Sequence, residues 1–475
     1  MAGTLQSVPG FNLQPSTEKK TLSTNYITNF DFLNQYLPDT YEKEFERYGN
    51  RTIASFLRAV GAEMPSNSDL IKWAEQGRLH TKYINCTTTA TVGNDTATFT
   101  VNDTLVPGAT TVSSGQIAFR IGQTVFISDN ASTVSYKAII TGVNYAADEF
   151  TVAFYEAGGM IVAGAGRVYT AFVYGSEFKK GTEGMVESVE PSDFIFENSP
   201  IIIKDKYAVS GSEMAQIGWV EVTTENGATG YLWYIKAEHE TRLRFEDYLE
   251  MSMIEAVPAE ANSGAVATAG YVGNKGSEGL FYVVGQRGNV YAGGNPTTLA
   301  DFDSIIQRLD KQGSIQENAI FVNRQFSFDI DDMLASQNSY GAGGTSYGLF
   351  DNDKDMALNL GFTGFRRGYD FYKTDWKYLN DATTRGGIVG GAVNGVLVPA
   401  GSTTVYDQVL GKNAKRPFLH VRYRASETED RRYKTWITGS AGGASTSSLD
   451  AMEVHFLSER ALCTLGANNF VLFEN

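Results

Sequence analysis

One uninterrupted segment, residues 234–256, constrains the fold more than any other part of this 475-residue sequence. It contains neither Gly nor Pro, which predicts a continuous helix of about 34 Å. Glu238 and Glu240 each precede an Arg by four residues, the order that favours ion pairs along a helix. Apolar side chains recur at helical spacing in its second half, at Phe245, Leu249, Met253 and Ala256. Because its first half is charged nearly all round, the segment predicts a strut between layers.

Residues 81–174 have a different pattern, which predicts an all-β module, either a barrel or a sandwich. Short β-branched and aromatic runs recur there about every 8–12 residues and are separated by Gly, Asn and Asp. The expected strands are TATFTV, QIAFRIG, TVFIS, YKAIITGV, EFTVAFY and RVYTAFVYG. Since helical patterns are expected on both sides, the block is interpreted as an insertion.

The segments around these two elements are simpler. Residues 1–37 are polar and aperiodic with scattered aromatic side chains, which predicts an arm without a core of its own. Residues 38–80 predict a helical segment, with one helix after Pro38 and a short second helix through DLIKWAEQ. Residues 175–229 contain two extended runs, PIIIKDKYAVSG and QIGWVEVTT, which predict a long β-hairpin.

The C-terminal half alternates between strand and helix patterns, which predicts α+β or α/β layers. LFYVVG and NAIFVN are expected to be buried strands, and residues 295–313 and 326–336 helices. The last segment, MEVHFLSERALCTLGANNFVLFEN, predicts a strand, a short turn and a final apolar strand.

The balance of positive and negative charges argues against some classes of function. There are 39 Lys and Arg residues against 54 Asp and Glu residues, a net charge of −15. This argues against a polyphosphate-binding groove but not against a protein that encloses nucleic acid without binding it tightly. Cys86 and Cys463, the two cysteines, supply neither a disulfide framework nor a zinc cluster. The N-terminus lacks a signal-peptide pattern and no apolar run reaches roughly 18 residues, so we expect a soluble protein from a reducing compartment.

Histidine offers no metal centre in this sequence. No His has another His or a Cys at ligand spacing, and the H-E-x-x-H pattern fails after His239 because Leu243 occupies the last position. All four are expected to be structural or solvated: His80, His239, His420 and His455.

Two loops match catalytic or metal-binding motifs weakly. GTSYG puts Ser346 at the centre of G-x-S-x-G, but a nucleophile elbow needs a strand before it and a helix after it. DNDKD spaces Asp351, Asp353 and Asp355 like the start of a calcium loop, but Met356 stands where Gly is required. We expect a solvated acidic turn and leave metal binding there open. The glycine clusters match no phosphate-binding template.

Other charged clusters are interpreted structurally. One acidic run is expected at a helix N-terminus, where carboxylates suit the dipole: Asp329, Asp331 and Asp332. Two basic pairs are expected to form salt bridges between subunits rather than to line a nucleic-acid groove: Arg366 with Arg367, and Arg431 with Arg432.

In the order of its parts, the sequence resembles the major capsid proteins of tailed bacteriophages with the Hong Kong 97-type fold, most like those of crAss-like phages. The apolar-Ser-Glu-Arg-apolar run Leu457–Ala461 resembles part of their closing strands. The resemblance implies an α+β fold with the following parts: an N-terminal arm at 1–37, an N-terminal helical segment at 38–80, an inserted β-rich domain at 81–174, an extended loop at 175–229, the spine helix of a peripheral domain at 230–264, an axial domain with connecting elements at 265–445 and C-terminal strands of the peripheral domain at 446–475.

Some members of that family cross-link covalently through Lys and Asn with a catalytic Glu. Lys179, Lys180 and Lys204 lie in or near the expected extended loop. No motif marks them, so no cross-linking residue is assigned.

The resemblance implies a structural protein without enzymatic activity or cofactor. Copies of the chain would assemble into hexamers and pentamers of an icosahedral shell that encloses double-stranded DNA without a specific binding site. Expected partners are further copies of the chain, a portal, and auxiliary or decoration proteins, with no membrane. Assembly is expected in the host bacterial cytoplasm and the final location in the virion. The alternatives are a phage or bacterial adhesin with a glycan-binding β domain, and a hydrolase using Ser346.

Overall fold

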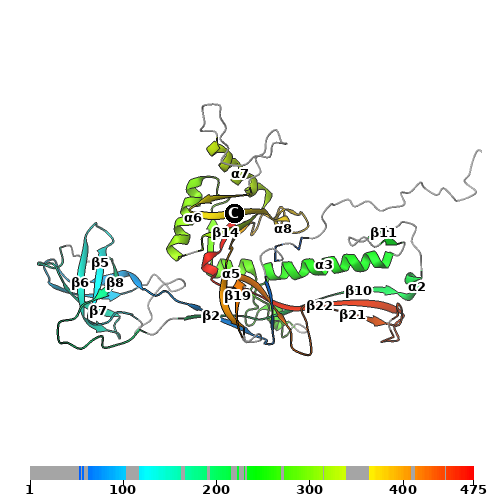
Figure 1. Ribbon diagram of the computed structural model, residues 1–475, viewed down its shortest axis with the longest axis horizontal. Helices are drawn as coiled ribbons and strands as arrows, with labels where there is room; N and C mark the ends of the chain where they lie inside the picture. Colours follow the sequence, from blue (N-terminus) through cyan, green and yellow to red (C-terminus); the bar gives the residue numbers. More distant parts are fainter. Residues whose placement is uncertain are drawn as a thin grey trace, which may run out of the picture. The chain divides into compact units, whose positions relative to one another are not determined.

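The computed structural model describes residues 53–54, 56–57, 62–102, 117–161, 166–189, 193–215, 222–223, 229–230, 233–268, 272–313, 315–338, 363–407, 412–443 and 445–475 (Figure 1). The chain divides into two compact units, residues 1–49 with 212–237, and residues 50–211 with 238–475. The arm expected at 1–37 and most of the helix expected after Pro38 lie outside the described residues.

The long helix is confirmed as α3 (Trp233–Glu255), which has 23 residues. Phe245 and Met253 are completely buried, as the apolar stripe predicts. Arg242 pairs with Glu246, one turn further on, at 3.5 Å. Because Phe245 packs on Phe456 with ring centroids 5.7 Å apart, the stripe faces the sheet that α3 follows in Figure 1.

That sheet has five strands, β1 (Ala62–Ser66), β20 (Leu419–Arg424), β22 (Ala451–Thr464), β10 (Ile201–Ser210) and β21 (Lys434–Gly439). The 14-residue β22 is central: β10 pairs with it along ten residues, and β20 and β21 pair with it as well. The hairpin predicted within 175–229 is therefore wrong, because the partner of β10 comes from the far end of the chain. β11 (Val222–Thr223) and β12 (Thr229–Gly230) form only a two-residue ladder after the short α2 (Gly211–Met214).

The helix predicted through DLIKWAEQ is also wrong. This segment is β2 (Ile71–Gln76), which pairs antiparallel with β9 (Asp193–Asn198) to form a two-stranded ribbon. Side chains of β2 alternate between more exposed and less exposed positions, the two-residue period of a strand. A short segment with few apolar residues does not distinguish the helical from the extended period by sequence alone.

Between the two ribbon strands the chain forms a closed barrel of six strands: β3 (Lys82–Thr88), β4 (Thr96–Val101), β5 (Gln123–Asp129), β6 (Ser135–Asn144), β7 (Glu149–Phe154) and β8 (Tyr169–Ser176). Five of the expected strands are present, whereas β3 was not predicted. QIAFRIG contributes Ile117 and Phe119 to the barrel core without forming a strand. The core stacks aromatic rings, among them Phe99 on Phe150 at 5.4 Å, so the module buries its own hydrophobic cluster.

The C-terminal half builds a six-stranded sheet in the order β13 (Asn289–Ala292), β23 (Val471–Glu474), β17 (Val393–Pro399), β14 (Glu317–Val322), β16 (Tyr369–Asp375) and β15 (Gly364–Arg367). Two helices predicted from sequence, α6 (Leu299–Gln312) and α7 (Arg324–Asn338), pack with it. Thr298 and Asp301 form a capping box at the start of α6, and Gly313 ends that helix at a φ of 73°.

The strand predicted at LFYVVG is wrong, because this run is the helix α5 (Leu280–Arg287). Its apolar residues are consecutive, and such a run suits a buried strand and a buried helix equally. The remaining elements are α4 (Gly264–Ala267), α8 (Lys377–Asn380), the pair β18 (Ser402–Asp407) and β19 (Lys412–Pro417), and the 3₁₀ turn η2 (Ala467–Asn469). The closing strand–turn–strand pattern is confirmed, but β22 and β23 enter two different sheets.

Phe245→Ala is expected to lower the free energy of unfolding by about 3–5 kcal/mol, since it empties the buried contact between α3 and β22. Tyr248→Ala, at a partly exposed position of the same helix, is the matched control and should cost less than about 1 kcal/mol. Denaturant unfolding of the two variants measures the difference. Equal losses would contradict the packing described for α3.

Candidate functional site

The residues that the sequence marked for chemistry are not brought together. His80 is exposed, and His239 lies on α3. His420 is buried with Nδ1 3.3 Å from the Pro417 carbonyl, and His455 stacks on Trp436 at 5.0 Å. Within the described ranges, no group of three or more His, Cys, Asp or Glu residues is arranged to bind a metal ion.

The two loops with weak motifs cannot be placed. Ser346 and the aspartates Asp351, Asp353 and Asp355 lie in residues 339–362, outside the described residues. The two cysteines are described: Cys86 lies in the barrel core and Cys463 in β22. Burial raises the pKa of each thiol to about 12, so both remain protonated and unreactive at neutral pH.

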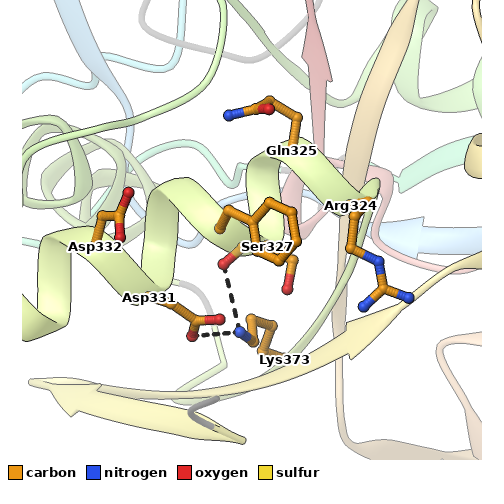
Figure 2. A pocket seen from close by; sticks show the side chains of 7 residues that line it. Arg324, Gln325, Ser327, Asp331, Asp332 and Lys373 are labelled. Atoms are coloured by element: carbon orange, nitrogen blue, oxygen red, sulfur yellow. Dashed lines mark hydrogen bonds and ion pairs between the residues drawn. The ribbon is translucent and has the colours of Figure 1, made fainter. Parts of the chain in front are cut away.

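The acidic run Asp329, Asp331 and Asp332 is not at a helix N-terminus, because α7 already begins at Arg324. Asp331 instead forms an ion pair of 2.5 Å with Lys373 of β16, and both side chains are nearly buried. Figure 2 shows this pair in an open pocket of about 610 Å³. The Lys373 ammonium also donates to the carbonyl oxygen of Ser327, at 3.4 Å. Because this bond is to the backbone and not to the hydroxyl, it does not pair a nucleophile with a base.

The two basic pairs make salt bridges within the chain, and the expectation that they bridge subunits stays a prediction. Arg366 contacts Asp370 at 3.0 Å, and Arg367 pairs with Asp303. Arg431 contacts Glu459 at 2.6 Å, and Arg432 pairs with Glu63. These cations are therefore partly neutralised inside one copy of the chain.

The Ser-Glu-Arg run in β22 is buried, which its polar and charged residue types alone do not predict. Ser458 donates a hydrogen bond to the Arg432 carbonyl at 2.6 Å, and Arg460 contacts both Ser458 and that carbonyl, at 2.9 and 3.1 Å. Burial lowers the pKa of Arg460, and Glu63 at 3.6 Å opposes this shift. The run thus joins β22 to β1 and to the segment before β21 through satisfied polar contacts.

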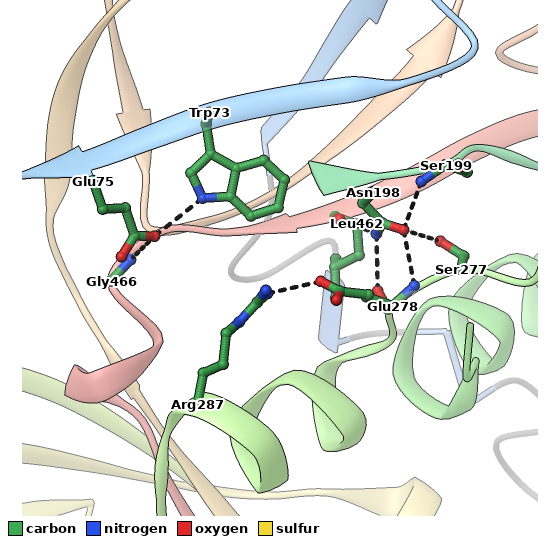
Figure 3. Close-up of polar contacts among 9 residues, drawn as sticks. All are labelled: Trp73, Glu75, Asn198, Ser199, Ser277, Glu278, Arg287, Leu462 and Gly466. Atoms are coloured by element: carbon green, nitrogen blue, oxygen red, sulfur yellow. Dashed lines mark hydrogen bonds and ion pairs between the residues drawn. The ribbon is translucent and has the colours of Figure 1, made fainter. Parts of the chain in front are cut away.

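The base of the ribbon, in the unit 50–211 with 238–475, carries a network of polar contacts (Figure 3). Asn198 ends β9 and is buried. Its amide nitrogen donates to the carbonyls of Leu462 and Glu278, at 2.7 and 3.0 Å. Its oxygen accepts from Ser277 Oγ at 3.0 Å, Glu278 N–H at 2.9 Å and Ser199 N–H at 2.8 Å. One side chain therefore ties β9 to β22 and to the segment before α5.

The other ribbon strand is anchored through Glu75. Its carboxylate accepts hydrogen bonds from Trp73 Nε1 at 3.0 Å and from Gly466 N–H at 2.9 Å (Figure 3). Arg287 of α5 lies over the ring of Phe196, 4.3 Å from its centre, and also pairs with Glu278 at 2.7 Å. The two strands of the ribbon are thus held at opposite ends, β9 at the base through Asn198 and β2 near the barrel through Glu75, although no sequence motif marks these residues.

Large apolar side chains remain exposed along the same elements. Ile195 on β9 is 69% exposed, Ile202 on β10 is 53% exposed, and Val389 in the loop before β17 is 92% exposed. Lys179, Lys180 and Lys204 are exposed too, and nothing in their surroundings marks one of them for cross-linking. The described part of the chain therefore assigns no role to these lysines or to these singly exposed apolar side chains.

No protein-family model matches the chain, and no curated protein matches it. Solved structures do match it over most of its length. The Cyanophage A-1(L) capsid asymmetric unit has a TM-score of 0.44 and 10% identity, covering 93% of this chain and 98% of that chain. A chain of Microbacterium phage Oxtober96 has a TM-score of 0.39 and 10% identity, covering 92% of this chain and 95% of that chain. The capsid of a native GTA particle has a TM-score of 0.38 and 8% identity, and the match again covers 92% of this chain and 95% of that chain.

The chain is therefore similar to solved structures of phage-type capsids. None of the helices in the described ranges is long and apolar enough to cross a membrane.

Asn198→Ala is expected to lower the free energy of unfolding by roughly 2–4 kcal/mol, because it leaves the Leu462 carbonyl and the Glu278 backbone groups buried without their partner. Asn144→Ala, at an exposed position in the barrel, is the control and should stay within about 0.5 kcal/mol. Protease digestion under native conditions should also cut the Asn198 variant faster at the ribbon base. A variant as stable and resistant as the parent would contradict the role of Asn198.

Proposed function

We propose that the chain is the structural major capsid protein of a tailed double-stranded DNA phage, with a Hong Kong 97-type fold and greatest similarity to crAss-like phages. The observation that carries the proposal is the path of the chain around α3. β10 precedes α3, the chain from β13 to β17 then supplies five of the six strands of a second sheet, and β22 returns to pair with β10 along ten residues before β23 completes that second sheet. This path is the one implied by the resemblance of the sequence.

The extended loop is reassigned in this proposal. The ribbon of β2 and β9, with the barrel between its strands, takes the part first expected for residues 175–229. The five-stranded sheet with α3 corresponds to the peripheral domain and the six-stranded sheet to the axial domain. The barrel is the inserted domain.

The proposed mechanism is association between copies. The arm at residues 1–37 and exposed apolar residues such as Ile195 and Ile202 are covered by neighbouring copies in hexamers and pentamers. Interfaces of this obligate kind bury at least about 2,000 Å². A portal and auxiliary or decoration proteins are further proposed partners, and no enzymatic step or cofactor is part of the proposal.

The acidic composition suits a wall around packaged DNA. A net charge of −15 repels phosphate at long range, and basic residues such as Arg366, Arg367 and Arg431 are paired within the chain. The shell thus encloses double-stranded DNA without a specific site. Assembly takes place in the host bacterial cytoplasm and the product is the virion.

The purified protein is expected to elute as capsomers or shells in size-exclusion chromatography and to appear as rings or closed particles in electron microscopy. A variant lacking residues 1–37 should shift toward smaller species, because the proposed covering of neighbours is lost. Arg366→Ala, which removes an exposed ion pair within one copy, is the control and should assemble normally.

Other outcomes decide against the proposal. An elongated trimer that binds glycans and forms no shells would favour the adhesin. A compact monomer with esterase or peptidase activity that disappears in Ser346→Ala would favour the hydrolase.

A further inference from the structure

The outer face of the barrel carries an aromatic row that the capsid proposal does not use. The alternation in β5 and β8 turns Val125, Ile127 and Ala171 into the barrel core and puts Phe126 and Phe172 on the outside. The two rings lie opposite each other on neighbouring strands, with centroids 5.2 Å apart. Phe172 is 37% exposed.

Lysines stand on both sides of this aromatic pair. Lys137 of β6 is in register with Phe126, and Lys82 of β3 is in register with Phe172. The aromatic row Lys137–Phe126–Phe172–Lys82 therefore crosses four adjacent strands, about 14 Å along the barrel surface. Both lysines are exposed, and neither is paired with a carboxylate in the described part of the chain.

A second row runs beside the first. Ser128 of β5 is in register with Ser135 of β6 and with Thr170 of β8. These three residues form a hydroxyl row, two positions along each strand from the aromatic row, on the same outer face. The barrel thus presents flat rings, hydroxyl groups and two cations side by side.

Two further aromatic side chains extend the surface. Tyr174 follows Phe172 by two residues on β8 and is 50% exposed. Tyr155 is bonded through its backbone N–H to the Lys137 carbonyl, at 3.1 Å, and its hydroxyl donates to Glu177 at 2.6 Å. The position of Tyr155 is therefore fixed before any ligand arrives.

We propose that this face of the barrel binds an acidic carbohydrate chain. Rings stack on the apolar faces of sugars, the hydroxyl row bonds to sugar hydroxyls, and Lys82 and Lys137 pair with carboxylates on the ligand. The OB-fold, another small barrel, also binds oligosaccharides, as well as oligonucleotides, on a strand face.

The size and charge of the face exclude the competing occupants. A stable protein interface takes about 20–30 residues a side, far more than these two rows offer, so a second copy of the chain is not the ligand. Single-stranded nucleic acid also stacks on aromatic rings, but it is held by a positively charged groove that follows its phosphate backbone. This face instead offers two lysines, Lys82 and Lys137, at the two ends of the aromatic row, with hydroxyl groups beside it.

Binding of the full-length protein to immobilised polygalacturonate, dextran and oligo-dT tests the proposal by biolayer interferometry. We expect binding to polygalacturonate that weakens with salt, at least about tenfold weaker binding to neutral dextran, and none to oligo-dT. Phe126→Ala with Phe172→Ala should weaken binding to polygalacturonate about tenfold. Lys82→Ala with Lys137→Ala, which changes only exposed side chains, should do the same and remove the salt dependence.

Tyr372→Ala, an exposed aromatic position on β16, is the matched control and should bind like the parent. The proposal is overturned by the absence of binding to polygalacturonate, by equal binding to dextran, or by tighter binding to oligo-dT. It is also overturned if the lysine variant binds within twofold of the parent. Failure of this test leaves shell assembly unaffected, so the two proposals are judged separately.

Discussion

The pairing of β22 on both of its edges is the interaction on which the five-stranded sheet depends. Its 14 residues take β10 on one side and both β20 and β21 on the other, so three strands pair directly with β22 and β1 joins them through β20. Phe456 and Leu462 of the same strand enter two different contacts, with Phe245 of α3 and with the core around Trp376. Loss of β22 would therefore leave β10 and β21 without a partner in their sheet.

The barrel is built on a different principle, since it closes on itself and fills its interior with its own side chains. The ribbon of β2 and β9 connects it to the five-stranded sheet. The ribbon is anchored by polar contacts at both ends, through Asn198 at its base and through Glu75 near the barrel. Because such contacts are directional, they fix the path of the two strands more sharply than apolar packing does.

Ion pairs between largely buried side chains connect segments that are far apart in the sequence. Glu459 contacts Arg431 and Arg424, and Lys373 contacts Asp331 where both side chains are nearly buried. Ion pairs of this kind add little net stability, but a single unpaired member would be costly. They therefore specify which segments meet.

The sequence by itself determined the elements whose signals are local. α3 and α6 follow from helical periodicity and from capping residues such as Thr298 and Gly313, and most of the barrel strands follow from β-branched runs between turn residues. Only the tertiary structure decided which strands pair, because the hydrogen bonds of a strand are made with whichever edge the whole chain brings alongside. β10 thus pairs with β22 rather than with a local hairpin partner, and the apolar run of α5 becomes a helix. For the same reason, Asn198 and the aromatic row of the barrel carry no sequence signal: their partners lie on other strands and acquire meaning only once the register is set.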